Sequence, residues 1–481
     1  MASSTKDRLI PSVIGIYTAV LAILAIVVSF PETGELIFRG YFIQDADEVI
    51  RAWYGRCSWR NPNIIPFSHL SMPGWTAALA LGEGAGRLVG LPLTLPGRLI
   101  TVGLSAWCLT SMSGLVRAVG GTARHALIAV LILAVSPAFF LLSVSVYPSI
   151  GLAAVVLAGC RFFAEDRFRA AAIVVGWAPL IRWEGVLIVA LFAVFLAWRR
   201  AWRTLPWLFG PYVLYLVLSA LRFGNPWAPL AYRTTKHMGS WLIFNPDLPW
   251  ERLRLGLINL ATFFSPAVLL AGLPIAAYGA IRHFRAIGPL PFAFAGLTVA
   301  LGSIHHEWIV YALRVFATPL VLGIAVVMAV AVRAGRTLQI GLIALLIVGT
   351  LASDVLVYNR INNAPVPAPG RARADVGFHA VVRYADASST LDFIAAANAD
   401  WVIVNHLNAN LLRADETCSL YDHGLRLGGP RMSLGYEFTP AFEIPTGSGL
   451  VVFHTLPIGV DECEEVLVDE AIHQRVYRCT R

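Results

Sequence analysis

The main pattern along the chain is a series of apolar stretches of 15 to 25 residues, separated by short polar or basic turns. A bilayer hydrocarbon core about 30 Å thick is crossed by a helix of about 20 apolar residues, so each stretch predicts a membrane-spanning helix. We predict eleven spans, at residues 11–30, 99–116, 125–143, 144–162, 169–183, 184–198, 204–222, 257–281, 287–303, 308–332 and 337–358. The first is interpreted as an uncleaved anchor, because it ends at VVSFPETG without an A-x-A cleavage site.

One further apolar segment, at 74–92, carries Glu83 and Arg87, and its status decides the topology. If it does not span, the N-terminus and every arginine-rich turn fall on one side, as the positive-inside rule requires of cytoplasmic loops. We therefore interpret 74–92 as an interfacial or re-entrant helix. The arginine-rich turns hold Arg117 and Arg124; Arg161, Arg167 and Arg169; Arg199, Arg200 and Arg203; Arg282 and Arg285; and Arg333 and Arg336.

The same topology places four regions together on the outer side of the membrane. They are the first outer loop at 31–98, the turns near Tyr147 and Arg182–Glu184, the loop 223–256, and the turn His305–Glu307. The segment 361–481 also lies outside, and it opens with the proline-rich linker NNAPVPAPG.

Strand-like runs at 401–405 and 450–454 and a helical stretch at 389–398 predict a small C-terminal α/β domain. The expected fold class is thus an α-helical polytopic membrane protein. Residues 1–358 form the transmembrane module and residues 359–481 the extracytoplasmic domain. We expect the cytoplasmic (inner) membrane as its location.

Composition agrees with this organisation. The chain is 57% hydrophobic and only 14% charged, whereas a soluble protein has about 25% charged residues. Its net charge of +8 divides into +14 for residues 1–360 and −6 for residues 361–481. This excludes a chain of soluble domains and a disordered chain, and it explains the positive charge by cytoplasmic turns rather than by nucleic-acid binding.

The six cysteines divide between the two regions. Cys108 and Cys160 fall in apolar spans and are interpreted as core residues. The other four lie outside, where disulfides persist. Proximity favours a Cys463–Cys479 bridge, but four cysteines allow three pairings. The outer cysteines are Cys57, Cys418, Cys463 and Cys479.

Acidic residues gather just after the first span, in QDADE. Asp45, Asp47 and Glu48 are candidates for a general base that activates a hydroxyl acceptor at the membrane surface. A helix cap with first-turn acids is the alternative, and it explains one acid better than three. His69, later in the same loop, is a weaker candidate because a lone histidine is more often structural.

Arg182 and Glu184 interrupt a continuous apolar stretch in IRWEG. Ionisable residues at membrane depth are costly and usually face a cavity or each other. The planar fork of Arg182 suits a phosphate. The alternative is a local Arg–Glu pair that holds a tight turn.

Two more clusters carry charge. In HHEWIVYALRVF, His305, His306 and Glu307 are followed by Arg314, and no second histidine completes a zincin motif. Arg233 and Lys236 lie beside aromatic residues in the loop 223–256, where a basic interfacial belt is the alternative interpretation.

These features, in this order, resemble the GT-C superfamily of integral-membrane glycosyltransferases over residues 10–335. Asp47-Glu48 is similar to the acidic pair in the first outer loop of that family, RWEG to its R-x-E-G turn, and HHEWIVYALRVFATP to its His-x-Glu element followed by an Arg-Phe helix. Ala46 stands where some branches have Pro, and SVYPSIG lacks an Asp found in some members. The WWD-type signature of oligosaccharyltransferases is missing from the sequence.

The resemblance implies inverting transfer of a single sugar, mannose by the HHE element, from a polyprenyl-phosphate-sugar to a hydroxyl of a lipid, glycan or protein. Asp47 would act as base, with Arg182, His306 or Arg314 at the donor phosphate. No cofactor is required by the motifs, and a divalent metal stays open. A transporter or flippase is the main alternative, and it predicts acids within spans and a repeated half. A non-catalytic scaffold would leave the three clusters apart in space.

Overall fold

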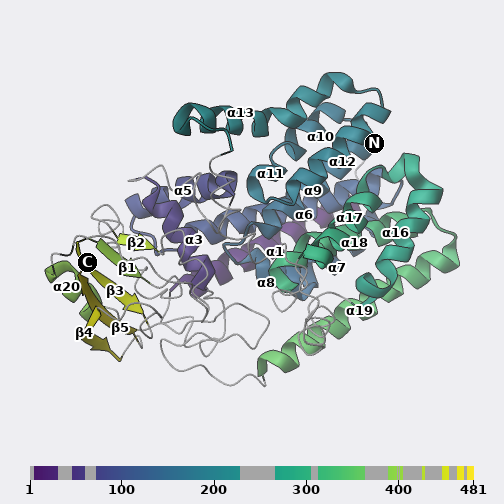
Figure 1. Cartoon of the computed structure of the whole chain (residues 1–481). Helices are drawn as coiled ribbons and strands as arrows, with labels where there is room; N and C mark the ends of the chain where they lie inside the picture. The colour runs from purple at the N-terminus through teal and green to yellow at the C-terminus, as the bar shows by residue number, and fades with distance from the viewer. Residues whose placement is uncertain are drawn as a thin grey trace. The chain divides into compact units, whose positions relative to one another are not determined.

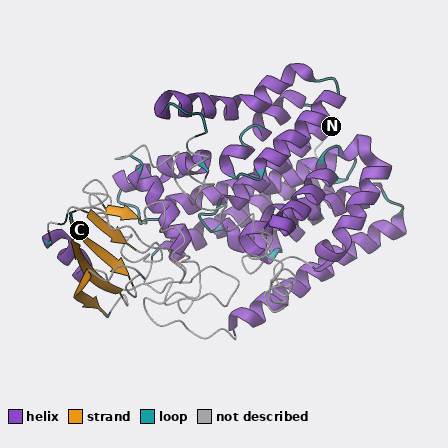
Figure 2. Cartoon of the chain, in the orientation of Figure 1, coloured by secondary structure: helices purple, strands orange, loops and turns teal. Residues whose placement is uncertain are grey.

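A computed structural model describes residues 5–30, 46–59, 72–227, 266–304, 312–362, 388–397, 399, 401–404, 425–427, 447–453, 463–470 and 474–480. Helices make up most of the described chain, and its strands form one sheet near the C-terminus (Figure 2). The expected fold class, a helical membrane module followed by a small α/β domain, is confirmed.

Every predicted span contains helix (Figure 1). In chain order the elements are α1 (Thr5–Ser29), α6 (Leu95–Ala118), α7 (Ala123–Val135), α8 (Pro137–Ser143), α9 (Pro148–Ala164), α10 (Phe168–Val175), α11 (Ala178–Ile181), α12 (Gly185–Trp198), the 3-10 turn η1 (Trp202–Thr204), α13 (Leu205–Phe223), α16 (Pro266–Ile287), α17 (Leu290–Ile304), α18 (Ala312–Arg333) and α19 (Arg336–Asn362).

Several of these helices are shorter than a bilayer is thick. Within the described residues, five helices are long and apolar enough to cross a membrane, or six if the bent pair α7–α8 counts as one span. The pair bends by 70° at Ser136–Pro137, where proline removes a backbone donor and ends the first helix. The predicted span at 169–183 is likewise divided into α10 and α11, with Pro179 in the first turn of α11.

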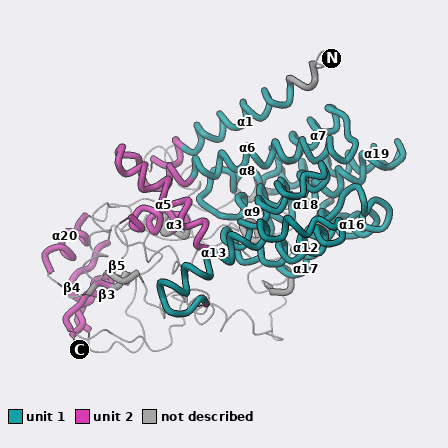
Figure 3. Tube along the Cα trace, turned by 90° about the horizontal axis from the view of Figure 1, so that it is seen from above, with its two compact units in different colours: residues 1–25, 98–226, 244–363 teal, residues 26–97, 227–243, 364–481 magenta. Residues whose placement is uncertain are grey.

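The chain divides into two compact units (Figure 3). The first unit comprises residues 1–25, 98–226 and 244–363. The second comprises residues 26–97, 227–243 and 364–481, which are stretches that the topology prediction assigns to the outer side, together with the end of the first span.

Helix α18 forms the centre of the first unit. It packs against α7, α8, α9, α16, α17 and α19, and its side chains from Phe316 to Ala331 are almost wholly buried. In contrast, α13 exposes large apolar side chains, including Val213, Leu214 and Leu221. Exposed apolar surface of this kind suits a lipid-facing helix, while α18 provides a rigid support for the polar groups near its start.

In the second unit, helix α3 (Ala46–Cys57) packs closely on α5 (Pro73–Leu88). A Cβ on Gly55 would lie only 2.7 Å from the backbone of Leu79, so glycine is needed for this approach. Glu83 of α5 is fully buried and accepts the backbone N–H of Gly97 at 3.0 Å. Its Oε2 lies 3.5 Å from Nη2 of Arg56 in α3. The 16-residue helix α5 therefore covers most of the segment 74–92, and its acid is hydrogen-bonded inside the protein.

The C-terminal sheet has five strands in the order β2-β1-β3-β5-β4. The strands are β1 (Trp401–Val404), β2 (Leu425–Leu427), β3 (Ser448–Phe453), β4 (Cys463–Asp469) and β5 (Gln474–Thr480). The first three pair in parallel, and β5 pairs antiparallel to β3 and β4. The predicted strands at 401–405 and 450–454 and the helix α20 (Ser388–Ala396) are all present.

Five of the six cysteines lie in the described residues, and Cys418 lies outside them. Cys463 and Cys479 form a disulfide across β4 and β5, and Cys57 is also disulfide-bonded. Cys108 and Cys160 are free and buried in helices of the first unit.

On strands β4 and β5, a side-chain hydrogen bond with Glu465 raises the pKa of Arg475 above its usual value.

Candidate functional site

The candidate site in the described part of the first unit is the turn between α11 and α12. Arg182 ends α11 in an extended conformation (φ −145°, ψ 148°), and Glu184 immediately precedes α12. A Cβ on Gly185 would lie 2.2 Å from the backbone of Ala178, so only glycine lets the chain fold back this tightly. The turn thereby brings the side chains of residues 182 and 184 onto the same side.

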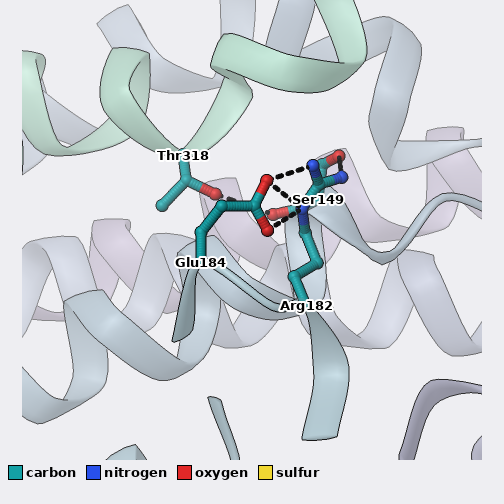
Figure 4. Close-up of polar contacts among 4 residues, drawn as sticks. All are labelled: Ser149, Arg182, Glu184 and Thr318. Carbon is teal, nitrogen blue, oxygen red and sulfur yellow. Dashed lines mark hydrogen bonds and ion pairs between the residues drawn. The ribbon is translucent and has the colours of Figure 1, made fainter. Parts of the chain in front are cut away.

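Arg182 and Glu184 form a close ion pair (Figure 4). Nε of Arg182 donates to Oε1 and Oε2 of Glu184 at 3.1 and 3.0 Å, and Nη2 also donates to Oε1. The Glu184 side chain is 1% exposed, whereas that of Arg182 is 15% exposed. The carboxylate is thus buried inside the protein, whereas part of the Arg182 side chain is accessible.

Two further helices hold this pair. Nη1 of Arg182 donates to the hydroxyl of Ser149, in the first turn of α9, at 3.1 Å. The hydroxyl of Thr318, in α18, donates to the carbonyl oxygen of Ser149 at 3.3 Å. Figure 4 shows the four residues converging from the turn, from α9 and from α18. Because α18 is the core helix, the position of the guanidinium is fixed from the centre of the unit.

Donors remain for a ligand. A guanidinium has five N–H groups. The bonds to Glu184 and Ser149 use three of them, which leaves two without a partner among the described residues. An arginine that is held in place, partly exposed and incompletely bonded can bind an anion such as a phosphate in addition to its carboxylate partner.

Arg314 belongs to the same region by its position in the sequence. It lies in the first turn of α18, four residues before Thr318, so the helical period places both Cα atoms on one face of the helix. The predicted phosphate ligands Arg182 and Arg314 are therefore both carried by elements at the Ser149–Thr318 contact.

The acids of the first outer loop lie in the second unit. Helix α3 begins at Ala46, which puts Asp47 and Glu48 in its first turn, the place that the capping interpretation requires. Glu48 is buried, with 1% of its surface exposed. The remaining predicted site residues, Asp45, His69, Arg233, Lys236, His305, His306 and Glu307, lie outside the described residues.

Ser149 and Thr318 are the polar residues of the site that the sequence did not single out. They are 169 positions apart, and each is a small hydroxyl in an apolar helix beside proline, a context shared by many structural residues. In the described ranges no group of three His, Cys, Asp or Glu side chains is placed to hold a metal ion.

No family model and no curated protein matches the sequence. The structure, however, is similar in fold to two solved proteins, ArnT and an archaeal oligosaccharyltransferase. ArnT from Cupriavidus metallidurans in the apo state is similar over 97% of this chain and 98% of its own, with a TM-score of 0.52 and 14% identity. The same protein bound to undecaprenyl phosphate gives a TM-score of 0.51 at 12% identity, over 96% of this chain and 97% of its own.

A second solved structure is the apo oligosaccharyltransferase from Archaeoglobus fulgidus. It is similar over 92% of this chain, with a TM-score of 0.52 and 15% identity. The chain spans 62% of the length of that enzyme. In contrast, the ArnT similarity extends over nearly the whole of both proteins, including the C-terminal part, so ArnT is the better guide to the architecture.

Proposed function

We propose that the protein is an inverting membrane glycosyltransferase that moves one sugar from a polyprenyl-phosphate-sugar to a hydroxyl acceptor at the outer face of the inner membrane. The observation that carries this proposal is Arg182, held by Glu184 and Ser149 with two N–H groups that have no partner among the described residues. It lies in a bundle with the fold of a protein solved with undecaprenyl phosphate. A phosphate on a lipid that never leaves the bilayer is a suitable anion for an arginine in a membrane domain.

The proposed reaction assigns each charge a partner. The acceptor oxygen attacks the anomeric carbon, and Asp47 takes the hydroxyl proton as general base. The bond between that carbon and the phosphate oxygen breaks, and its electron pair leaves with the polyprenyl phosphate. Arg182, with Arg314 and His306, stabilises the negative charge that develops on this leaving group. Mannose is the proposed sugar, and the acceptor is a lipid, a glycan or a protein.

The test is sugar transfer by purified protein in liposomes, using a panel of radiolabelled polyprenyl-phosphate sugars with added lipid and glycan acceptors. We expect Asp47→Asn to lower kcat at least 100-fold, because an amide cannot accept the acceptor's proton, while leaving expression and the melting temperature unchanged. Asp166→Asn is the matched control, since Asp166 is an exposed acid in the turn between α9 and α10.

Each alternative result has a meaning. Full activity of Asp47→Asn would move the base to Asp45. If wild-type protein transfers none of the sugars but moves labelled lipid-phosphate sugar across the liposome membrane, the protein is a flippase and the glycosyltransferase proposal is wrong.

A further inference from the structure

We propose that Glu184 keeps the donor-phosphate site electrically balanced, so that the more highly charged polyprenyl phosphate product can leave. This inference rests on the proposed function, because it assigns the donor phosphate to Arg182. Glu184 then acts as a positioning and charge-balancing residue, and Arg182 makes the contact with the phosphate.

The donor and the product of the proposed reaction differ in charge. The donor is a phosphodiester with one negative charge, whereas the product is a phosphomonoester whose second pKa lies near 6, which gives it a charge between −1.5 and −2 at about pH 7. An uncompensated arginine would therefore attract the product more strongly than the donor. Transfer would be followed by slow product release.

The Arg182–Glu184 pair is arranged so that the carboxylate offsets the charge of the guanidinium. Both carboxylate oxygens of Glu184 accept bonds from Arg182, and the carboxylate is 1% exposed, so water screens it little. The pair has no net charge, yet two N–H groups of Arg182 have no partner among the described residues and can recognise phosphate oxygens. Recognition of the phosphate then depends mainly on directed hydrogen bonds. Their strength differs less between donor and product than the charge–charge attraction to an uncompensated arginine would.

Ser149 helps to fix the orientation of the Arg182 guanidinium. If Glu184 alone held Arg182, an arriving phosphate could pull the side chain away from its carboxylate. The bond from Nη1 to the hydroxyl of Ser149 at 3.1 Å, with Ser149 held in turn by Thr318 of the core helix, opposes this movement. The carboxylate therefore stays beside the guanidinium during the catalytic cycle.

The experiment measures product binding directly and during turnover. Glu184→Gln keeps the shape and one acceptor oxygen but removes the charge. We expect it to tighten equilibrium binding of undecaprenyl phosphate to the purified full-length protein by about tenfold, with intrinsic tryptophan fluorescence as one readout. In turnover, we expect product inhibition to strengthen by a similar factor, the donor KM to fall less, and kcat to fall.

Glu165→Gln is the matched control. Glu165 pairs with Arg161 at 2.7 Å in the turn that follows α9, the same kind of Arg–Glu contact at a place where no substrate is proposed. This variant should bind undecaprenyl phosphate as the wild type does.

The results separate charge balance from a merely structural role. Unchanged or weaker product binding by Glu184→Gln, alone or together with a lower melting temperature, would overturn the inference. If product binding tightens as expected but no preparation transfers sugar, the charge balance is upheld and the glycosyltransferase proposal fails independently.

Discussion

At the scale of single residues, two Arg–Glu pairs of the described chain have a buried glutamate, Arg56–Glu83 and Arg182–Glu184. In the second unit, Arg56 donates to the carbonyl oxygen of Leu91 as well as facing Glu83, so the pair holds together the chain on either side of α5. In the first unit, Arg182 remains partly exposed and keeps donors for an anion. The first pair is suited to stability, and the second to binding.

Glu83→Gln tests this difference. Removing one charge from a buried pair leaves the other uncompensated and typically costs about 3 kcal/mol. Because Glu83 is fully buried and also accepts the N–H of Gly97, we expect a clear fall in melting temperature in detergent. Glu465→Gln, which breaks the exposed Glu465–Arg475 pair of the same unit, should change it little. Equal effects of the two substitutions would show that the Glu83 pair does not stabilise the unit.

At the scale of elements, the tight turn between α11 and α12 places the candidate site. We expect Gly185→Ala to lower donor affinity at least tenfold, because the added methyl group would collide with the backbone of Ala178 and shift Arg182 relative to Ser149. The donor KM is the measurement. Gly341→Ala in α19, where a Cβ meets nothing within 4 Å, is the control and should leave the KM unchanged. An unchanged KM for both variants would mean that the turn tolerates movement without loss of donor binding.

The elements also show what the sequence can predict. Long apolar runs located a helix in each predicted span, and the two-residue spacing of Arg182 and Glu184 made their pairing foreseeable because it is local. The breaks within spans were harder to place, since a proline such as Pro11 or Pro319 is also accommodated inside a helix. Strand β4 was missed because CEEVLVD puts adjacent acids in a strand that pairs on only one side. The Ser149–Thr318 contact depends on how distant helices pack, which no local pattern specifies.

At the scale of the whole molecule, charge and cysteine chemistry divide the chain in the same way. Among the described residues, the disulfide-bonded cysteines, Cys57, Cys463 and Cys479, all belong to the second unit. The free thiols Cys108 and Cys160 are buried in the first. Disulfides persist in oxidising compartments, and short arginine-rich turns stay in the cytoplasm. Both rules therefore predict that the C-terminal sheet lies outside and that turns such as the one holding Arg203 lie inside.

Cysteine labelling in intact cells tests this orientation. Glu470 follows β4 and Arg203 lies in η1, and both side chains are exposed, so cysteine substitutions there should be reachable from water. We expect a membrane-impermeant maleimide to label Glu470→Cys in intact spheroplasts and Arg203→Cys only after the membrane is permeabilised. The wild-type chain provides the background, which should be low because the free thiols among the described residues, Cys108 and Cys160, are buried. Labelling of Arg203→Cys in intact spheroplasts would invert the topology. It would also place the Arg182 turn on the cytoplasmic side, since α12 separates that turn from Arg203, and the proposed transfer would then have to use a donor in the inner leaflet.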